Sequence, residues 1–121
     1  MQLDDLLKYD DHGLICAVIQ HFETGQVLMV GYMNRESLGM TLRDNKATFW
    51  SRSRQKLWLK GESSGNFLHV KEVRIDCDGD ALVLQCDPVG PTCHTNETTC
   101  FYRIVNGDES IELAGDGVAP E

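Results

Sequence analysis

Residues 14–33 read LICAVIQHFETGQVLMVGYM and contain two apolar segments separated by a polar one. The two apolar, β-prone runs, 14–20 and 27–33, flank the polar segment HFETGQ, in which Thr24-Gly25 is a turn signal. The stretch therefore predicts a β-hairpin. A short helix is expected directly after it, because Asn34 is a residue type that caps helix N-termini.

Four further segments, ATFWSR, FLHVKEVRI, ALVLQC and FYRIV, have the β-branched and aromatic content of strands and are separated by polar turns. We therefore predict a mainly β (α+β) domain with one helix. Within residues 67–75 the apolar and polar residues alternate imperfectly, so the pattern leaves open which face of that strand is buried.

Length and charge predict one compact domain over residues 1–105 and an acidic, mobile C-terminal tail over residues 106–121. The formal net charge is −8, and the tail holds five acids without a Lys or Arg, so the rest of the chain is close to balance. The sequence has no apolar run of membrane-spanning length, and its start is too acidic for a signal peptide. We expect a cytoplasmic protein with no membrane partner.

The five cysteines argue against a disulfide framework, because their number is odd and the sequence shows no secretory signal. Cys16 and Cys86 lie in apolar runs and are predicted to pack in the core. The other three, Cys77, Cys93 and Cys100, are candidate metal ligands.

The segment Asp76-Cys77-Asp78-Gly79-Asp80 concentrates three carboxylates at the end of a predicted strand. Hard oxygen ligands at this density suit Mg²⁺. A calcium EF-hand does not fit, because the glycine falls too early in the loop and the flanks are predicted strands. If the strand continued to Asp78, Asp76 and Asp78 would share one face and Cys77 would point to the other. An acidic, solvated turn is the alternative interpretation.

The segment GPTCHTNETTCFYR, residues 90–103, holds Cys93 and Cys100 with six residues between them. Thiolates select Zn²⁺, and a catalytic zinc commonly keeps three protein ligands and a water, so these two cysteines with Cys77 would suffice. Burial of both cysteines beside a strand is the alternative. His94, next to the first cysteine, is the candidate for proton transfer.

Residues 49–66, FWSRSRQKLWLKGESSGN, interleave two tryptophans with four basic residues. A base could stack on either tryptophan while the basic side chains bind phosphate, which suits a nucleotide. Single-stranded nucleic acid would suit the same pattern, and a strand with a buried Trp and a solvated basic face is a third interpretation. The candidate substrate-binding residues are Trp50, Arg52, Arg54 and Lys60.

Together with LMVGYMNRESL at residues 28–38 and VRIDCDGDALVLQ at residues 73–85, these segments make the chain resemble the monofunctional form of phosphoribosyl-AMP cyclohydrolase, an enzyme of histidine biosynthesis. The resemblance covers most of residues 28–103. For the fold it implies a small antiparallel, barrel-like sheet with one capping helix. It also implies an intertwined homodimer whose active sites form between subunits.

The same resemblance implies a ligand set and a reaction. Magnesium would be held by Asp76, Asp78 and Asp80, and zinc by Cys93 and Cys100 of one subunit with Cys77 of the other. A zinc-activated water would open the adenine ring of 1-(5-phosphoribosyl)-AMP at the N1 to C6 bond, with His94 moving the proton. The product would be the phosphoribosyl-formimino imidazole carboxamide ribonucleotide.

Two other classes of protein share part of this pattern. Zinc nucleobase deaminases carry paired H-x-E and P-C-x-x-C signatures, but only His21-Phe22-Glu23 matches, within a predicted turn, and no P-C-x-x-C follows. A zinc-stabilised nucleic-acid-binding module would use the Trp and Arg segment and bind single strands in a salt-sensitive way. We expect instead a small-molecule nucleotide and a second copy of the chain as partners, and no nucleic acid.

Overall fold

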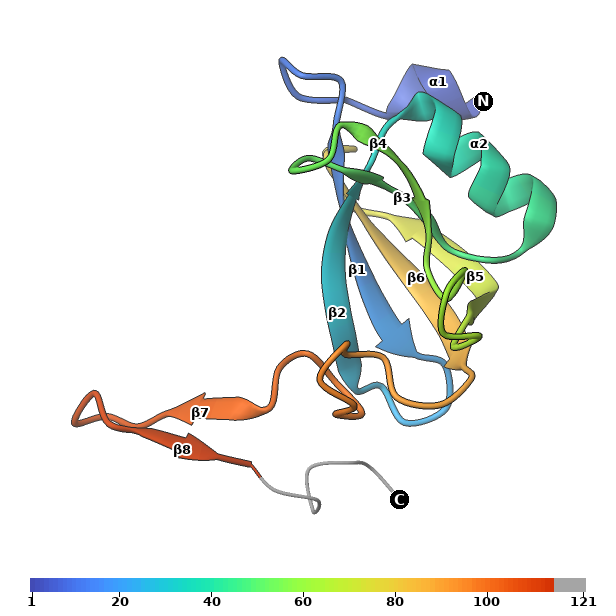
Figure 1. Ribbon diagram of the computed structural model, residues 1–121. Coiled ribbons are helices and arrows are strands. Elements are labelled where there is room, and N and C mark those ends of the chain that lie inside the picture. The colour runs from blue at the N-terminus through green and yellow to red at the C-terminus, as the bar shows by residue number, and fades with distance from the viewer. Residues whose placement is uncertain (115–121) are drawn as a thin grey trace.

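The structure, a computed structural model, describes residues 1–114 of the chain and confirms a mainly β fold (Figure 1). The described part holds two helices, of which the short first one was not predicted, and neither is long and apolar enough to cross a membrane. The elements in chain order are α1 (Leu3–Leu6), β1 (Ile15–His21), β2 (Val27–Met33), α2 (Arg35–Asp44), β3 (Thr48–Ser51), β4 (Lys56–Leu59), β5 (Leu68–Ile75), β6 (Ala81–Pro88), β7 (Arg103–Val105) and β8 (Ile111–Leu113).

The predicted hairpin is present as β1 and β2, which pair antiparallel with one β-bulge after Ile19. Gly25 in the connecting turn has a φ of 80°, a conformation that glycine adopts at no steric cost. On one face of β1, Ile15, Ala17 and Ile19 are buried. This face of the hairpin therefore carries the core, as the alternation of a half-buried strand requires.

The main sheet is mixed, with the strand order β2-β1-β6-β5. β1 pairs antiparallel with β2 but parallel with β6. The prediction of an antiparallel, barrel-like sheet is therefore wrong on both points, because one pair is parallel and the described strands do not close into a barrel (Figure 1). The parallel pair arises because the chain crosses over through α2 and the β3–β4 hairpin to β5, and β6 then returns antiparallel to β5 and enters the sheet beside β1.

A β-bulge explains the imperfect alternation in residues 67–75. The pairing of β5 with β6 shifts register between Val70 and Glu72. Leu68 and Val70 therefore pack on the core before the shift, and Val73 and Ile75 pack on it afterwards. A bulge inserts one residue and reverses the facing of every later side chain, which a simple period of two does not describe.

The predicted helix is present as α2, and it begins at Asn34 as expected. Asn34 Oδ1 accepts the N–H of Ser37 at 2.8 Å, and Ser37 Oγ accepts the N–H of Asn34 at 2.9 Å. This reciprocal pair is a capping box. The buried residues of α2 are Ser37, Leu38 and Thr41, a narrow stripe that explains why its apolar residues follow helical spacing only loosely.

Of the two cysteines predicted to pack in the core, Cys86 is fully buried in β6 and Cys16 is half-buried in β1. Burial raises the pKa of Cys86 to about 12. Burial also raises the pKa of Cys16. Both thiols therefore stay protonated at neutral pH, which suits a packing role.

β7 and β8 form a separate hairpin that projects from the main body (Figure 1). We call residues 103–113 the arm. Its apolar side chains are exposed, to 71% for Val105 and 69% for Leu113. The arm overlaps the start of the predicted tail at residues 106–121, of which residues 115–121 lie outside the described residues. An isolated two-stranded hairpin is only marginally stable in water, so the arm needs a further surface to pack on.

Two glycines give a matched pair of substitutions. A Cβ on Gly31 would lie 2.7 Å from Cδ1 of the buried Phe49, so Gly31→Ala should lower the free energy of unfolding by about 1–3 kcal/mol. Inside α2, a Cβ on Gly39 would meet only the Arg35 guanidinium, at 3.4 Å. Gly39→Ala should therefore raise the free energy of unfolding by up to about 1 kcal/mol, because alanine favours the helix more than glycine does. Urea unfolding measures both changes, and effects of the same sign would contradict this packing.

Candidate functional site

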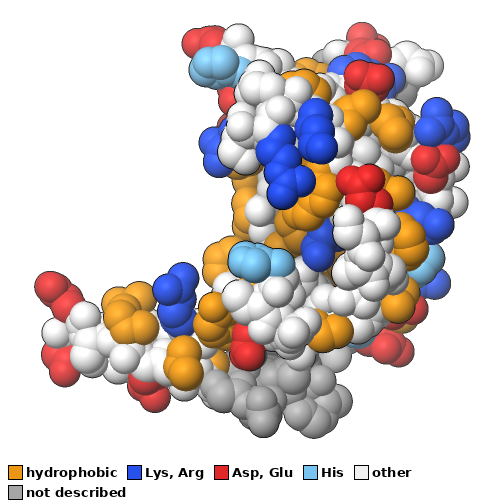
Figure 2. All heavy atoms as spheres, in the orientation of Figure 1, with side chains coloured by type: hydrophobic (Ala, Val, Ile, Leu, Met, Phe, Trp, Pro, Cys, Tyr) orange, Lys and Arg blue, Asp and Glu red, His pale blue; other side chains and the backbone are white. Residues whose placement is uncertain are grey.

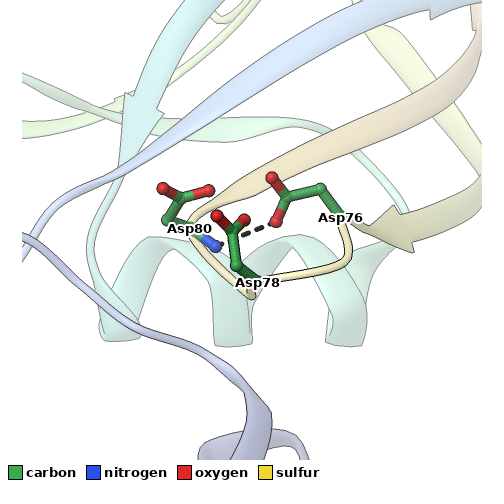
Figure 3. Close-up of side chains that lie close together, drawn as sticks. All are labelled: Asp76, Asp78 and Asp80. Atoms are coloured by element: carbon green, nitrogen blue, oxygen red, sulfur yellow. Dashed lines mark hydrogen bonds between the residues drawn. The ribbon is translucent and has the colours of Figure 1, made fainter.

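The three carboxylates predicted to bind a metal lie together at the turn between β5 and β6 (Figure 3). One oxygen from each of Asp76, Asp78 and Asp80 lies within 4.8 Å of the others. Because β5 ends at Ile75, the turn brings these side chains together, and the expectation based on a strand continuing to Asp78 does not hold. We call residues 76–80 the acidic turn.

Backbone contacts fix the acidic turn. Asp76 Oδ1 accepts the N–H of Asp80 at 2.9 Å. Gly79 has a φ of 79°, and a Cβ there would collide with the carbonyl oxygen of Leu6. Gly79 O also accepts the N–H of Lys8 at 2.8 Å. The segment after α1 therefore packs directly on the turn, and only glycine fits at this position.

The negative charges of the acidic turn oppose one another. Hydrogen bonds with Asp76 and Asp78, together with their charges, raise the pKa of Asp80 to about 6. Desolvation of the Asp76 carboxylate acts to raise its pKa. Hydrogen bonds with Asp80 and Asp78 outweigh this effect, so the pKa of Asp76 is lowered overall. A divalent cation would relieve the repulsion that favours a proton on Asp80. Three clustered carboxylates are also the hard donors that Mg²⁺ prefers.

The two candidate zinc ligands meet near the other end of the main sheet. The N–H of Cys100 donates to Leu28 O at 2.7 Å, and Thr99 Oγ1 donates to Val27 O, also at 2.7 Å. These bonds tie the loop after β6 to the start of β2. They place Cys93 and Cys100 on adjoining cavities, near enough for each thiol to shift the pKa of the other, which is the proximity that a shared metal would require.

The two thiols differ in acidity. Burial acts to raise the pKa of Cys93, but hydrogen bonds with Thr95, whose Oγ1 lies 3.0 Å from Cys93 Sγ, and with Cys100, aided by the charge of Lys60, lower it overall. Burial, then the charge of Cys93 and the bond between the thiols, raise the pKa of Cys100 to about 11. A soft cation would favour ionisation of both thiols, so the donor set fits Zn²⁺.

Cys77 does not join this pair within one copy of the chain. It is exposed in the acidic turn, which precedes β6, whereas Cys93 and Cys100 lie in the loop that follows β6. Strand β6 is eight residues long and lies between them. In the described part of the chain, the acidic turn is the one place where three potential ligands gather. A thiolate from Cys77 could therefore complete the cysteine pair only from a second copy.

Two adjoining cavities open beside the cysteine pair. The first, of about 350 Å³, is lined by Met29, Arg54, Trp58, Lys60, Thr92, His94 and Cys100. The second, of about 270 Å³, shares four of these residues and continues along the polar loop Gly61–Asn66 towards Cys93. His94 is exposed and lines both cavities. Lys60 is only 8% exposed, and no carboxylate in residues 1–114 forms an ion pair with it.

The predicted substrate-binding residues fall into two groups around the β3–β4 hairpin, over which basic side chains gather (Figure 2). Arg54 and Lys60 line the cavities beside the cysteine pair. Trp50 and Arg52 line a separate cavity of about 440 Å³. Trp58 is thus the tryptophan next to the cysteine pair, and the spacing of the two tryptophans gave no signal to distinguish them.

The fold and the site define a small, mainly β protein with one set of donors for a hard cation and another for a soft one. Comparison with known proteins identifies the family. The sequence model of phosphoribosyl-AMP cyclohydrolase matches residues 29–102, a range that contains both sets of donors.

Individual relatives agree with this match. The chain is 57% identical over 109 residues to the phosphoribosyl-AMP cyclohydrolase of Chlorobium phaeovibrioides, covering 90% of this chain and 80% of that protein. Identity to the protein of the same name from Prosthecochloris aestuarii is 55%, with the same coverage. For Chloroherpeton thalassium it is 52%, over 91% of this chain and 79% of that protein. The chain belongs to the phosphoribosyl-AMP cyclohydrolase family, a family of enzymes, and the resemblance inferred from its sequence is confirmed.

Asp80 predicts a specific pH dependence for the metal-free protein. Its pKa is raised from 3.8 to about 6, so between these values the folded chain binds more protons than the unfolded chain. The contribution of Asp80 to the free energy of unfolding should therefore fall as the pH rises from about 4 to about 6. The difference in melting temperature between the wild type and Asp80→Asn, followed against pH, measures this contribution.

Excess Mg²⁺ should reverse this trend, because a bound cation favours the ionised carboxylates. The ion should raise the melting temperature of the wild type above about pH 6 and have little effect below about pH 4. Asp80→Asn should respond more weakly. Stabilisation by Mg²⁺ that is equal at both pH values, or equal in the two proteins, would contradict binding at the acidic turn.

Proposed function

We propose that the chain hydrolyses 1-(5-phosphoribosyl)-AMP in histidine biosynthesis, opening the adenine ring at the N1 to C6 bond. The product is the phosphoribosyl-formimino imidazole carboxamide ribonucleotide. The observation that carries the proposal is the convergence of Cys100, His94 and Lys60 on one cavity of about 350 Å³, with Cys93 lining the adjoining cavity, in a chain of this family.

Zinc is the metal that the thiol pair fits. Three thiolates would bind it, from Cys93 and Cys100 of one copy of the chain and Cys77 of a second copy. Zinc held in this way would lower the pKa of a bound water towards neutrality and would so supply hydroxide at neutral pH. The Thr95 hydroxyl, 3.0 Å from Cys93 Sγ, stabilises that thiolate, and the charge of Lys60 favours ionisation of both thiols.

The side chains around the cavities bind the base and move the proton. C6 of the purine accepts the oxygen, because the ribosyl substituent on N1 makes this carbon electron-poor. Trp58, partly buried against the core, offers a flat face for the purine ring. His94 takes a proton from the attacking oxygen and donates it to N1 as the C6–N1 bond breaks.

The substrate carries two phosphates, and the chain offers two kinds of group to bind them. The acidic turn would hold Mg²⁺, whose positive charge would help to bind a phosphate. The basic side chains of the β3–β4 hairpin, Arg52, Arg54 and Lys60, bind phosphate directly. Trp50, in the same cavity as Arg52, offers a second flat surface to the substrate.

A homodimer would complete this site, and two features support it. Cys77 lies too far along the sheet to reach Cys93 and Cys100 of its own copy. The arm projects from the main body (Figure 1) and carries exposed apolar side chains (Figure 2), which include Val105 and Ile111. An exposed apolar surface on a projecting hairpin is typical of a protein interface, and exchange of the arms would intertwine the two copies.

Turnover of 1-(5-phosphoribosyl)-AMP by the purified protein, supplied with Zn²⁺ and Mg²⁺, tests the proposed reaction. Ring-opened product should accumulate, activity should disappear after chelation of zinc, and it should return when Zn²⁺ is added back. A folded, metal-loaded protein that gives no product would contradict the proposal. Salt-sensitive binding of single-stranded nucleic acid by such a protein would favour the nucleic-acid-binding class instead.

The role of His94 predicts a loss confined to the chemical step. His94→Ala should lower kcat by a factor of about 10²–10⁴ and leave the zinc content unchanged. His69→Ala, on β5 and away from both cavities, is the control and should keep most of the activity. Normal turnover by His94→Ala would exclude this role.

A further inference from the structure

We propose that the hydroxyl of Thr92 binds the nitrogen-bearing edge of the purine, a role that rests on the proposed function. Thr92 lines the cavity of about 350 Å³ together with His94 and Cys100. It immediately precedes Cys93 in the chain. The proposal makes Thr92 a substrate-binding residue in addition to the tryptophans and basic residues of the β3–β4 hairpin.

The hydroxyl of Thr92 is buried without a partner. Thr92 is 2% exposed, and its Oγ1 has no hydrogen-bond partner within the described chain. Two other buried threonines have bonded hydroxyls. Thr41 Oγ1 donates to Ser37 O at 2.8 Å, and Thr99 Oγ1 donates to Val27 O at 2.7 Å. Buried hydroxyl groups are nearly always hydrogen-bonded, so an unpaired one on a residue that lines a cavity points to a ligand.

The backbone of Thr92 is fixed by the loop. The N–H of Thr92 donates to Thr98 O at 3.3 Å, and the N–H of Cys93 donates to Glu97 O at 3.1 Å. Thr99 and the residue after it are in turn bonded to β2. The backbone of Thr92 is therefore held at the wall of the cavity, and its β-branched side chain has few χ1 rotamers to choose from.

The cavity has the chemistry of a purine-binding site. Met29 and Trp58 contribute apolar and flat surface, while Lys60 and His94 contribute polar groups. A hydroxyl both donates and accepts, so it suits an amino or imino nitrogen as well as an unprotonated ring nitrogen. Thr92 adjoins Cys93, so a base bound with C6 at the thiol pair would bring the edge that carries C6 next to Thr92.

Removal of this hydroxyl should have opposite effects on stability and on binding. Thr92→Val keeps the shape and removes the unpaired group, so the melting temperature of the ligand-free protein should stay equal or rise. The same change should weaken purine nucleotide binding. Thr92→Ser keeps a hydroxyl and should bind like the wild type. Thr41→Val is the control, because it removes a bonded hydroxyl remote from the cavity and should lower the melting temperature with binding unchanged.

The test uses metal-loaded, full-length protein with two probes: AMP as a non-reacting nucleotide, titrated by calorimetry, and 1-(5-phosphoribosyl)-AMP for kcat and KM. For Thr92→Val we expect an AMP Kd and a KM raised on the order of 10-fold, with zinc content unchanged. Wild-type Kd and KM in Thr92→Val, in a protein whose wild type is active, would overturn this inference alone. A wild type that neither binds AMP nor turns over the substrate would overturn the proposed function and this inference with it.

Discussion

The parallel ladder between β1 and β6, from Cys16↔Ala81 to His21↔Cys86, determines where both sets of candidate ligands lie. Because the two strands run in the same direction, the turn before β6 lies beside the start of β1. The loop after β6 lies beside the end of β1, where β2 begins. The acidic turn and the cysteine pair are therefore held apart by the same pairing that builds the core. Within the described chain, this geometry leaves the thiol pair without a third thiolate.

In each set of candidate ligands, negative charges repel one another, and a bound cation would reduce this repulsion. In the acidic turn, like charges raise the pKa of Asp80 to about 6. In the thiol pair, burial and the neighbouring thiolate raise the pKa of Cys100 to about 11, while hydrogen bonds favour ionisation of Cys93. Hard oxygen donors suit Mg²⁺ and thiolates suit Zn²⁺, so the two sites are expected to select different ions. The proposed chemistry depends on this separation, because zinc at the thiol pair would activate water and Mg²⁺ at the acidic turn would bind phosphate.

Local signals in the sequence were sufficient for the first half of the fold. Thr24-Gly25 between two apolar runs predicts the hairpin, and Asn34 predicts the start of α2, because turns and caps depend on residues close in the chain. The parallel pairing of β1 with β6 joins segments more than 60 residues apart, from Cys16 to Ala81, and has no local signal. The bulge in β5 could not be predicted either, because its only trace in the sequence is an imperfect alternation of apolar and polar residues.

In the candidate site, too, features set by residues close in the sequence could be predicted, and features set by packing could not. The acidic turn could be predicted because its three carboxylates are close in sequence, and the cysteine pair because thiols are few in the chain. The sequence did not distinguish Trp58 from Trp50, because which of them faces the cysteine loop depends on how the β3–β4 hairpin packs. Thr92 gave no signal at all. An unpaired hydroxyl is a property of packing, and a threonine in a polar loop is otherwise ordinary.

A site shared between two copies is tested most directly by combining two inactive variants, Cys77→Ala and Cys93→Ala. Each variant alone should lack turnover of 1-(5-phosphoribosyl)-AMP, because each of its sites lacks one thiolate. Coexpression forms hybrid dimers with one intact site, so about a quarter of wild-type turnover should return. Isolated hybrid dimers that remain inactive would contradict a site built from two copies of the chain.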